Sequence, residues 1–146
     1  MNYFDTSALI KLFVSERGSE VVERLVTTSR AVCTASIAYA EVHAGLSRRW
    51  RAGHLSAREY RATRDRFDGQ WRRYLRMDLR AEVLERARDL VQRHPLRGLD
   101  AIHLASALTL GASLGEAMRF VAADARLIEA AESERCPVLN VERGAR

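Results

Sequence analysis

Hydrophobic positions along the chain fall into two kinds of segment. Short continuous apolar runs are typical of buried strands, whereas apolar residues that recur every three or four positions are typical of amphipathic helices. The short runs predict strands over residues 2–5, 31–34, 74–77, 119–122 and 138–141. The periodic stretches predict a helix through Ala8, Leu9, Leu12 and Phe13, and further helices over residues 18–28, 36–51, 56–72, 79–93, 99–114 and 125–133.

Polar residues and a proline mark several boundaries between these elements. Ser36 is placed to cap the helix that follows it. Ser56 and Glu59 have the spacing of a capping box, in which each residue satisfies a backbone N–H of the first helical turn. Pro95 ends the helix before it, because the residue that precedes a proline is disfavoured in helical conformation. Strands and helices therefore alternate along the whole chain.

This alternation predicts an α/β protein in which helices cover both faces of a parallel sheet. The length of 146 residues suits a single domain over residues 1–146. In such sheets a site forms outside the carboxyl ends of the strands, at the point where the strand order reverses. The residues directly after the strands are therefore the first candidates for a functional site.

Two of these residues are acidic. Asp5 ends the first predicted strand, and Asp124 follows the fourth. Each also precedes a predicted helix, where a carboxylate can accept a backbone N–H as an N-cap. Taken singly, each residue is more often a cap than a site residue, so the sequence leaves both roles open.

A third acidic residue, Glu41, lies inside a predicted helix. It shares a helical face with Ile37, Ala38, Ala44 and Gly45, which we expect to pack inward. A carboxylate on such a face loses hydration at a large free-energy cost unless it has a partner or lines a site. We favour the site for Glu41.

The fourth acidic candidate, Asp100, opens the most apolar predicted helix, where a capping role again competes. His103 lies one turn further along the same face. A single histidine on an apolar helix is more often a hydrogen-bonded core residue than a ligand. We therefore assign no catalytic role to His103.

These four carboxylates would repel one another if folding gathered them at one edge of the sheet. The repulsion is about 1 kcal/mol per pair at ~4 Å in water and larger inside a protein. A site made of carboxylate oxygens, without cysteine or clustered histidine, suits a hard cation such as Mg²⁺ or Mn²⁺. Such an ion activates water and stabilises the charge that develops on a phosphate. Asp5, Glu41, Asp100 and Asp124 are therefore the predicted metal-binding and catalytic residues.

The charge of the chain points to a nucleic-acid partner. The net charge is +5 with an isoelectric point of about 9.9, and Lys11 is the only lysine, so arginine carries nearly all of the positive charge. The planar guanidinium suits phosphate recognition. The alternative is that an arginine-rich and alanine-rich composition reflects a GC-rich coding sequence.

Cysteine content and hydropathy bear on the cellular compartment. Cys33 and Cys136 are far apart in the sequence and form no ligand-like pair, which favours a reduced protein without disulfides. The apolar run over residues 3–14 is interrupted by charges and lacks a basic leader. The later run over residues 99–114 is too short to span a bilayer. We expect a cytoplasmic protein that does not contact a membrane.

Arginines and aromatic residues are interspersed between Arg48 and Arg76. One interpretation is RNA binding, with phosphate contacts from arginine and base stacking on the aromatic rings. The other is that the aromatic residues pack at an interface with a second subunit or a partner protein. We favour phosphate contact for the arginines and an interface for the aromatic residues, which are Trp50, Tyr60, Phe67, Trp71 and Tyr74.

Four segments of the chain resemble the acidic motifs of PIN-domain proteins, in particular VapC-type toxins of bacterial toxin–antitoxin pairs. Asp5 to Leu12 looks like the opening motif, and Ala40 to Val42 resembles the second. Leu99 to Ala105 resembles the third motif, and Phe120 to Asp124 the fourth. Any one motif is weak, but four in the same order across nearly the whole chain are specific, since chance matches must multiply.

This resemblance implies a three-layer α/β/α sandwich with a five-stranded parallel sheet. It also implies cleavage of RNA by an endonuclease that uses Mg²⁺ or Mn²⁺, a homodimer, and neutralisation by a cognate antitoxin. Asp5, Glu41 and Asp100 would hold the metal and its water, and Asp124 would complete the acidic pocket. Many relatives carry Thr, Ser or Asn where this chain has Ala122. That departure is the best support for the alternative, a non-catalytic module on the same fold that binds RNA or a protein.

Overall fold

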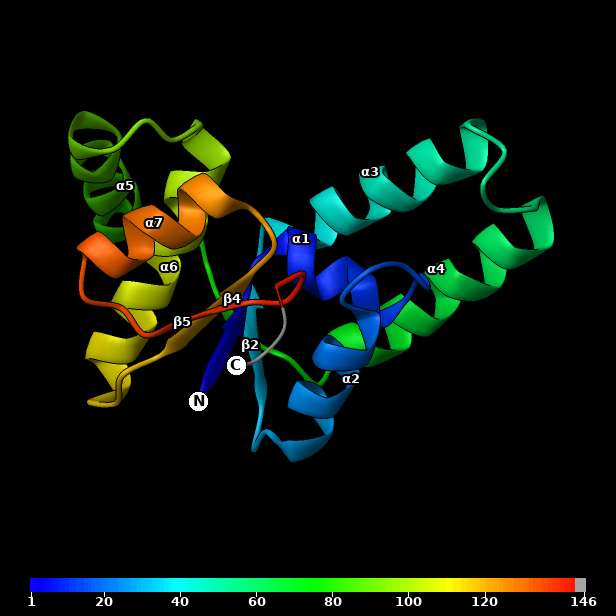
Figure 1. Cartoon of the computed structure of the whole chain (residues 1–146), viewed down its shortest axis with the longest axis horizontal. Helices are drawn as coiled ribbons and strands as arrows, with labels where there is room; N and C mark the ends of the chain where they lie inside the picture. The colour runs from blue at the N-terminus through cyan, green and yellow to red at the C-terminus, as the bar shows by residue number, and fades with distance from the viewer. Residues whose placement is uncertain (144–146) are drawn as a thin grey trace.

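The computed structural model describes residues 1–143 and forms a five-stranded parallel sheet with helices on both faces (Figure 1). Every strand and helix that the hydrophobic pattern predicts is present, with ends shifted by up to two residues. The strands are β1 (Asn2–Phe4), β2 (Val32–Ala35), β3 (Leu75–Met77), β4 (Arg119–Ala122) and β5 (Val138–Asn140). The helices are α1 (Thr6–Leu9), the 3-10 turn η1 (Ile10–Leu12), α2 (Ser19–Thr28), α3 (Ala38–Arg51), α4 (Ala57–Trp71), α5 (Ala81–Arg93), α6 (Gly98–Leu114) and α7 (Ala125–Ser133).

The order of the strands across the sheet is β3-β2-β1-β4-β5. The chain therefore builds the sheet outward from β1 in one direction, and then crosses to the other side of β1 to add β4 and β5. Tyr3 of β1 lies opposite Cys33 on one side and Phe120 on the other. The strand order thus reverses between β1 and β4, which is where a site is expected in an open parallel sheet.

Neighbouring side chains of each strand point to opposite faces of the sheet and divide the core into two halves. Tyr3 and Phe120 face one layer, with Leu90 of α5, Leu104 of α6 and Leu127 of α7 in the same cluster. The other cluster contains Phe4 and Val121 together with residues of α1, α2, α3 and α4. Figure 1 shows the two helical layers on either side of the strands. The predicted three-layer α/β/α architecture is confirmed.

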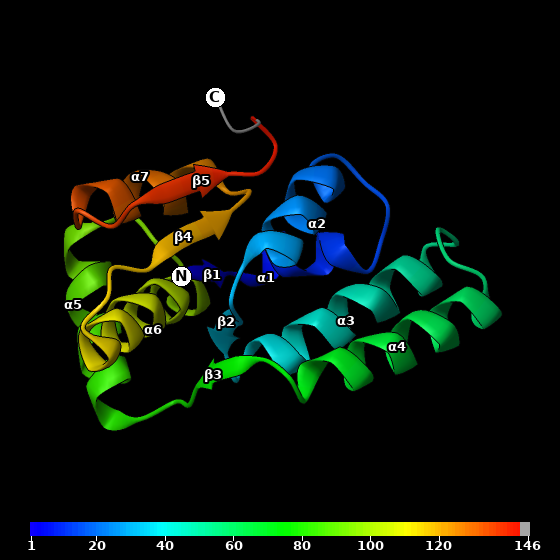
Figure 2. The same ribbon diagram turned by 90° about the horizontal axis from the view of Figure 1, so that it is seen from below.

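Helices α3 and α4 form an antiparallel pair that extends well beyond the sheet (Figures 1 and 2). Phe67 of α4 is fully buried between these helices and Phe13, and Tyr74 is 7% exposed. The predicted interface role is therefore wrong for these two residues, which pack in the core of the same chain. Trp50 stacks on Tyr60 with ring centroids 4.7 Å apart, so this pair stabilises the far end of the helical pair.

Two local predictions on helix starts have different outcomes. Ser56 and Glu59 form the expected capping box at the start of α4. Ser36 does not cap α3, whose N-cap is Ile37, because its hydroxyl donates instead to Asp78 after β3. Ser36 therefore connects the ends of the neighbouring strands β2 and β3 rather than capping the helix that follows it.

The structure also bears on the cysteine and hydropathy arguments. Cys33 and Cys136 are both buried and unpaired, in agreement with the prediction of a disulfide-free protein. Among the helices of residues 1–143, none combines the length and the apolar character needed to cross a membrane.

Candidate active site

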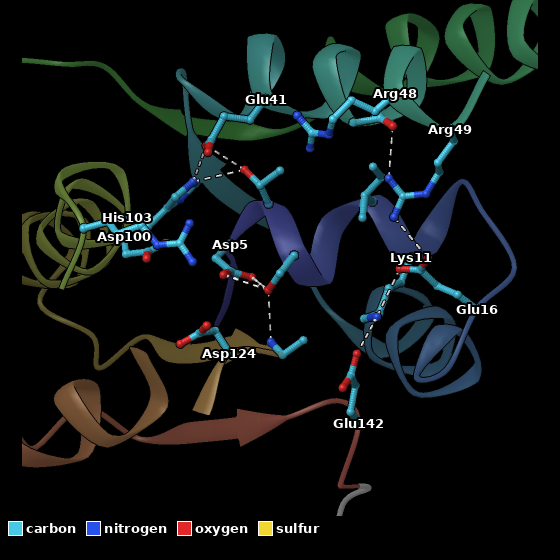
Figure 3. A pocket seen from close by; sticks show the side chains of 16 residues that line it. Asp5, Lys11, Glu16, Glu41, Arg48, Arg49, Asp100, His103, Asp124 and Glu142 are labelled. Carbon is cyan, nitrogen blue, oxygen red and sulfur yellow. Dashed lines mark hydrogen bonds and ion pairs between the residues drawn. The ribbon is translucent and has the colours of Figure 1, made fainter. Parts of the chain in front are cut away.

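The four acidic residues that the sequence singles out come from four separate elements and line one open pocket of about 340 Å³. Asp5 lies between β1 and α1, Glu41 on α3, Asp100 on α6, and Asp124 between β4 and α7. β1 and β4 are adjacent and parallel, so the residues that follow them lie side by side at the carboxyl edge of the sheet. Figure 3 shows the four side chains around one end of this pocket.

Asp5 is the most deeply buried of the four, with 3% of its surface exposed. Its Oδ1 accepts the backbone N–H of Ala8 at 2.9 Å, which makes Asp5 the N-cap of α1. The hydroxyl of Ser7 donates to the carboxylate at 2.7 Å from Oδ1 and 2.9 Å from Oδ2. Burial raises the pKa of Asp5 to about 6, although His103, Ser7 and Ala8 lower it in part. Asp5 therefore caps α1 and lines the pocket at the same time.

Asp100 lies in the first turn of α6 and caps nothing, because the N-cap of this helix is Arg97. The capping alternative for Asp100 is therefore wrong, and its carboxylate points to the pocket (Figure 3). Partial burial raises the pKa of Asp100 above its ordinary value, and the nearby carboxylate of Asp124 raises it further. Arg97 offsets this effect only in part.

Asp124 caps α7 through a 3.0 Å hydrogen bond from the backbone N–H of Leu127 to Oδ1. The preceding Ala122 is fully buried in the core and supplies no side-chain donor. The loop is instead joined to the first motif, because the backbone N–H of Ala123 donates to the Ser7 hydroxyl at 3.0 Å. The cap holds Asp124 in place where a polar residue at position 122 is missing.

Glu41 lies in the first turn of α3, with 26% of its side chain exposed. The inward packing predicted for its helical face holds for Ala38 and Gly45 but not for Ala44, which is exposed. Thr6 donates to Oε1 of Glu41 at 2.8 Å, and His103 Nε2 lies 2.7 Å from the same oxygen. Burial raises the pKa of Glu41, but the contacts with His103 and Thr6 lower it more, so the pKa lies below its ordinary value.

His103 is 2% exposed, and its ring is fully partnered, as the sequence argument expects of a core histidine. The sequence argument missed that one of these partners is Glu41, a residue of the site. The spacing of Asp100 and His103 shows only that they share a helical face. No pattern in the sequence reports that α3 and α6 meet at the end of β1.

The other end of the pocket holds a group of paired charges that sequence reasoning also missed (Figure 3). Lys11 is 5% exposed and lies 3.1 Å from Glu16 and 3.0 Å from Glu142. Arg49 of α3 joins this group at 3.1 Å from Glu16. Since Lys11 and Glu142 are separated by 131 positions, only the folded chain reveals the pair.

Two exposed arginines flank the acidic end of the pocket. Arg48 lies on α3, and Arg97 lies directly before α6. Within residues 1–143, neither side chain forms an ion pair or a hydrogen bond, unlike Arg49. Both guanidinium groups are therefore available to an anionic ligand that enters the pocket.

The acidic end of the pocket fits a hard divalent cation by the chemistry of its donors, which are carboxylate oxygens. In the described part of the chain, no Lys or Arg forms an ion pair with Asp5, Asp100 or Asp124, and burial raises the pKa of both Asp5 and Asp100. The same residues 1–143 contain no His, Cys, Asp or Glu group already close enough to form a complete ligand set. The four carboxylates reach the pocket from separate elements, so the fit to a cation rests on the chemistry of these donors.

The sequence is similar to known proteins over most of its length. Residues 3–138 match the PIN domain, a span that includes all four acidic residues. Ribonuclease VapC45 of Mycobacterium tuberculosis is 37% identical over 109 residues, which are 75% of this chain and 76% of that protein. Ribonuclease VapC46 of the same organism is 35% identical over 131 residues, which are 90% of each chain.

A similar fold occurs in a solved toxin–antitoxin complex from Klebsiella pneumoniae. The TM-score is 0.66 with 19% sequence identity, and the match covers 97% of this chain and 98% of that one. At this identity the likeness concerns the fold alone, and it supports the three-layer architecture described above.

Proposed function

The chain belongs to the PIN-domain family, and on that premise we propose that it is a metal-dependent endoribonuclease that acts as the toxin of a toxin–antitoxin pair. The observation that carries the proposal is the pocket in which Asp5, Glu41, Asp100 and Asp124 converge, none of them in an ion pair with a lysine or arginine of residues 1–143. The relatives described above are named ribonucleases, and they are identical to this chain at 37% and 35% of the aligned positions, which cover 75% and 90% of its length.

In this proposal the four carboxylates hold Mg²⁺ or Mn²⁺ near the scissile phosphate. The bound ion would lower the pKa of water and offset the charge that builds on the phosphate. Asp5 is held by Ser7 and by the start of α1, so its carboxylate keeps a fixed direction. Asp124 is held by the start of α7 in the same way. The chain thus contributes oxygen ligands on rigid supports, which favours binding in a single geometry.

Arg48 and Arg97 would bind phosphates of the RNA on either side of the bond that is cut. Both line the pocket and leave their guanidinium groups free in the described structure. Replacing either with glutamine should raise KM and reduce the dependence of binding on salt, because fewer counterions are released from the RNA. Arg24→Gln, which removes a charge from the exposed surface of α2, is the matched control and should leave both quantities unchanged.

The proposed partners are an antitoxin and a second copy of the chain. The Klebsiella pneumoniae protein with a similar fold was solved as a toxin–antitoxin complex, which supports an antitoxin for this chain. Expression of the chain alone should arrest bacterial growth, and co-expression with the protein encoded beside it should restore growth. Healthy growth at high levels of the soluble chain would argue against toxicity.

The direct test is cleavage of RNA by the purified protein in the presence of Mg²⁺ or Mn²⁺. We expect cleavage within RNA strands that stops in EDTA and is lost in Asp5→Asn. Asp65→Asn removes one negative charge from an exposed position on α4 and should cleave normally. Cleavage that persists in both EDTA and Asp5→Asn would contradict the proposal. Salt-sensitive RNA binding without cleavage under any divalent ion would instead identify a non-catalytic binding module.

A further inference from the structure

His103 connects three segments that surround the acidic end of the pocket. Its ring lies on α6, and its partners lie on β1, on α1 and on α3. The hydroxyl of Tyr3 is 2.9 Å from Nδ1, while Glu41 Oε1 is 2.7 Å and Thr6 Oγ1 is 3.1 Å from Nε2. Figure 3 shows the contact of His103 with Glu41 as a dashed line. A buried imidazole is thus in direct contact with a proposed metal ligand.

The partners of the ring assign its hydrogen to a particular nitrogen. Glu41 is a carboxylate, so the contact at 2.7 Å requires a hydrogen on Nε2. Tyr3 is fully buried, and its hydroxyl can donate to Nδ1. Its ring stacks on Phe120 with centroids 5.5 Å apart and meets His103 edge-on. Tyr3 therefore fixes both the direction of the imidazole ring and the nitrogen that faces Glu41.

The hydrogen bonds to Glu41 converge on one of its two oxygens. Thr6 donates to Oε1 at 2.8 Å, and His103 Nε2 donates to the same atom. Oε2 accepts no hydrogen bond from residues 1–143. A glutamate side chain has three rotatable bonds, so a carboxylate held by one oxygen presents the other in a far narrower range of directions than a free one.

We propose that His103 is a positioning residue, which with Tyr3 and Thr6 holds Glu41 by Oε1 and presents Oε2 to a divalent cation in the pocket. The inference rests on the proposed function only for the presence of that cation. It assigns to His103 no contact with RNA or with the ion. It also explains why a buried histidine follows Asp100 on the same face of α6: one residue faces the site, and the other orients a ligand from α3.

The test is the affinity of the full-length protein for Mn²⁺ without RNA, measured by calorimetry. His103→Leu removes the donor to Glu41 and should weaken Mn²⁺ binding by about 10-fold to 100-fold, the usual effect of losing a residue that orients a metal ligand. His103→Gln restores an N–H donor at the end of a side chain of similar reach and should recover much of the affinity. Recovery of this kind separates positioning from a general loss of packing.

Tyr3→Phe provides a second and milder variant, which keeps the ring in the core and removes only the hydroxyl that directs His103. We expect weaker Mn²⁺ binding than in the wild-type protein. Tyr74→Phe is the matched control, because the Tyr74 hydroxyl is buried without a hydrogen-bond partner in the described structure. It should not change Mn²⁺ affinity.

A nitrogen-detected NMR spectrum of the metal-free protein supplies a readout that is independent of the ion. We expect a hydrogen on Nε2 of His103, and an Nε2 that carries no hydrogen would overturn the inference. Unchanged Mn²⁺ affinity in folded His103→Leu or in Tyr3→Phe would also overturn it, even if the wild-type protein cleaves RNA. Failure of the proposed function looks different: the wild-type protein binds Mn²⁺ and the variants weaken it, but no RNA is cut.

Discussion

Asp5→Asn should stabilise the metal-free protein while it abolishes cleavage of RNA. Burial raises the pKa of Asp5 from 3.8 to about 6, so the folded state disfavours its charged form. The difference is about 2 pKa units, and each unit corresponds to about 1.4 kcal/mol, which gives about 3 kcal/mol at neutral pH. Asparagine keeps an oxygen for the backbone N–H of Ala8 and carries no charge.

The pH dependence of this effect follows from the direction of the shift. A carboxyl whose pKa is higher in the folded state lowers the free energy of unfolding as the pH rises from 3.8 to about 6. We therefore expect the variant to be more stable than the wild-type protein by about 3 kcal/mol at pH 7.5 in EDTA. The difference should shrink to about 0.5 kcal/mol at pH 4 and disappear below about pH 3, where the wild-type carboxyl is protonated in both states.

Urea denaturation followed by circular dichroism measures the free energy of unfolding of the variant and of the wild-type protein at pH 7.5 and at pH 4. Adding Mn²⁺ at about 1,000 times its dissociation constant should reverse the order at pH 7.5, because it stabilises the protein that binds it by about 4.1 kcal/mol, more than the advantage of the variant. Asp65→Asn, on the exposed surface of α4, should change the free energy of unfolding by less than ~0.5 kcal/mol. If Asp5→Asn destabilised the protein equally at both pH values, the carboxylate would be a structural cap, and the reasoning would be refuted.

Three further predictions concern the stability of the folded chain, each measured by urea denaturation. Lys11→Met leaves Glu16 and Glu142 without their shared cation and should lower the free energy of unfolding by about 1–2 kcal/mol. The loss is moderate because both glutamates are partly exposed. Equal stability would show that the ion pairs contribute nothing. Gly111→Ala places a Cβ 2.9 Å from the carbonyl oxygen of Glu116 and should cost about 1–3 kcal/mol. Gly69→Ala places a Cβ that meets no atom within 4 Å beyond its chain neighbours and the backbone of α4, and should stabilise this helix by about 0.5–1 kcal/mol. Ser56→Ala removes the cap of α4 and should cost about 1 kcal/mol; no loss would mean that packing alone fixes the start of this helix.

The sequence predicts those parts of the site that depend on topology. Asp5 and Asp124 follow strands, and parallel strands that meet at a reversal of strand order bring the residues after them together. The free-energy cost of burying a charge also identifies Glu41, because its carboxylate lies on a helical face that is predicted to pack inward. These arguments use local periodicity and one general rule for parallel sheets, so they need no knowledge of the packing of particular helices.

The remainder of the site depends on contacts between distant segments, which local patterns do not encode. His103 meets Glu41 because α6 and α3 flank the same end of β1 from opposite faces of the sheet. Lys11 meets Glu142 because the chain after β5 returns to the end of the first motif. Phe67 illustrates the same limit in the core: its helical spacing is compatible with an interface or with internal packing, and only the position of α3 decides.

The most direct test of the whole account is a crystal of the protein soaked in Mn²⁺ and measured at the manganese absorption edge. The account predicts an anomalous peak within coordination distance of the carboxylates of Asp5, Asp100 and Glu41, with Asp124 beside it. It would be contradicted by a crystal that binds Mn²⁺ elsewhere while these acids remain apart.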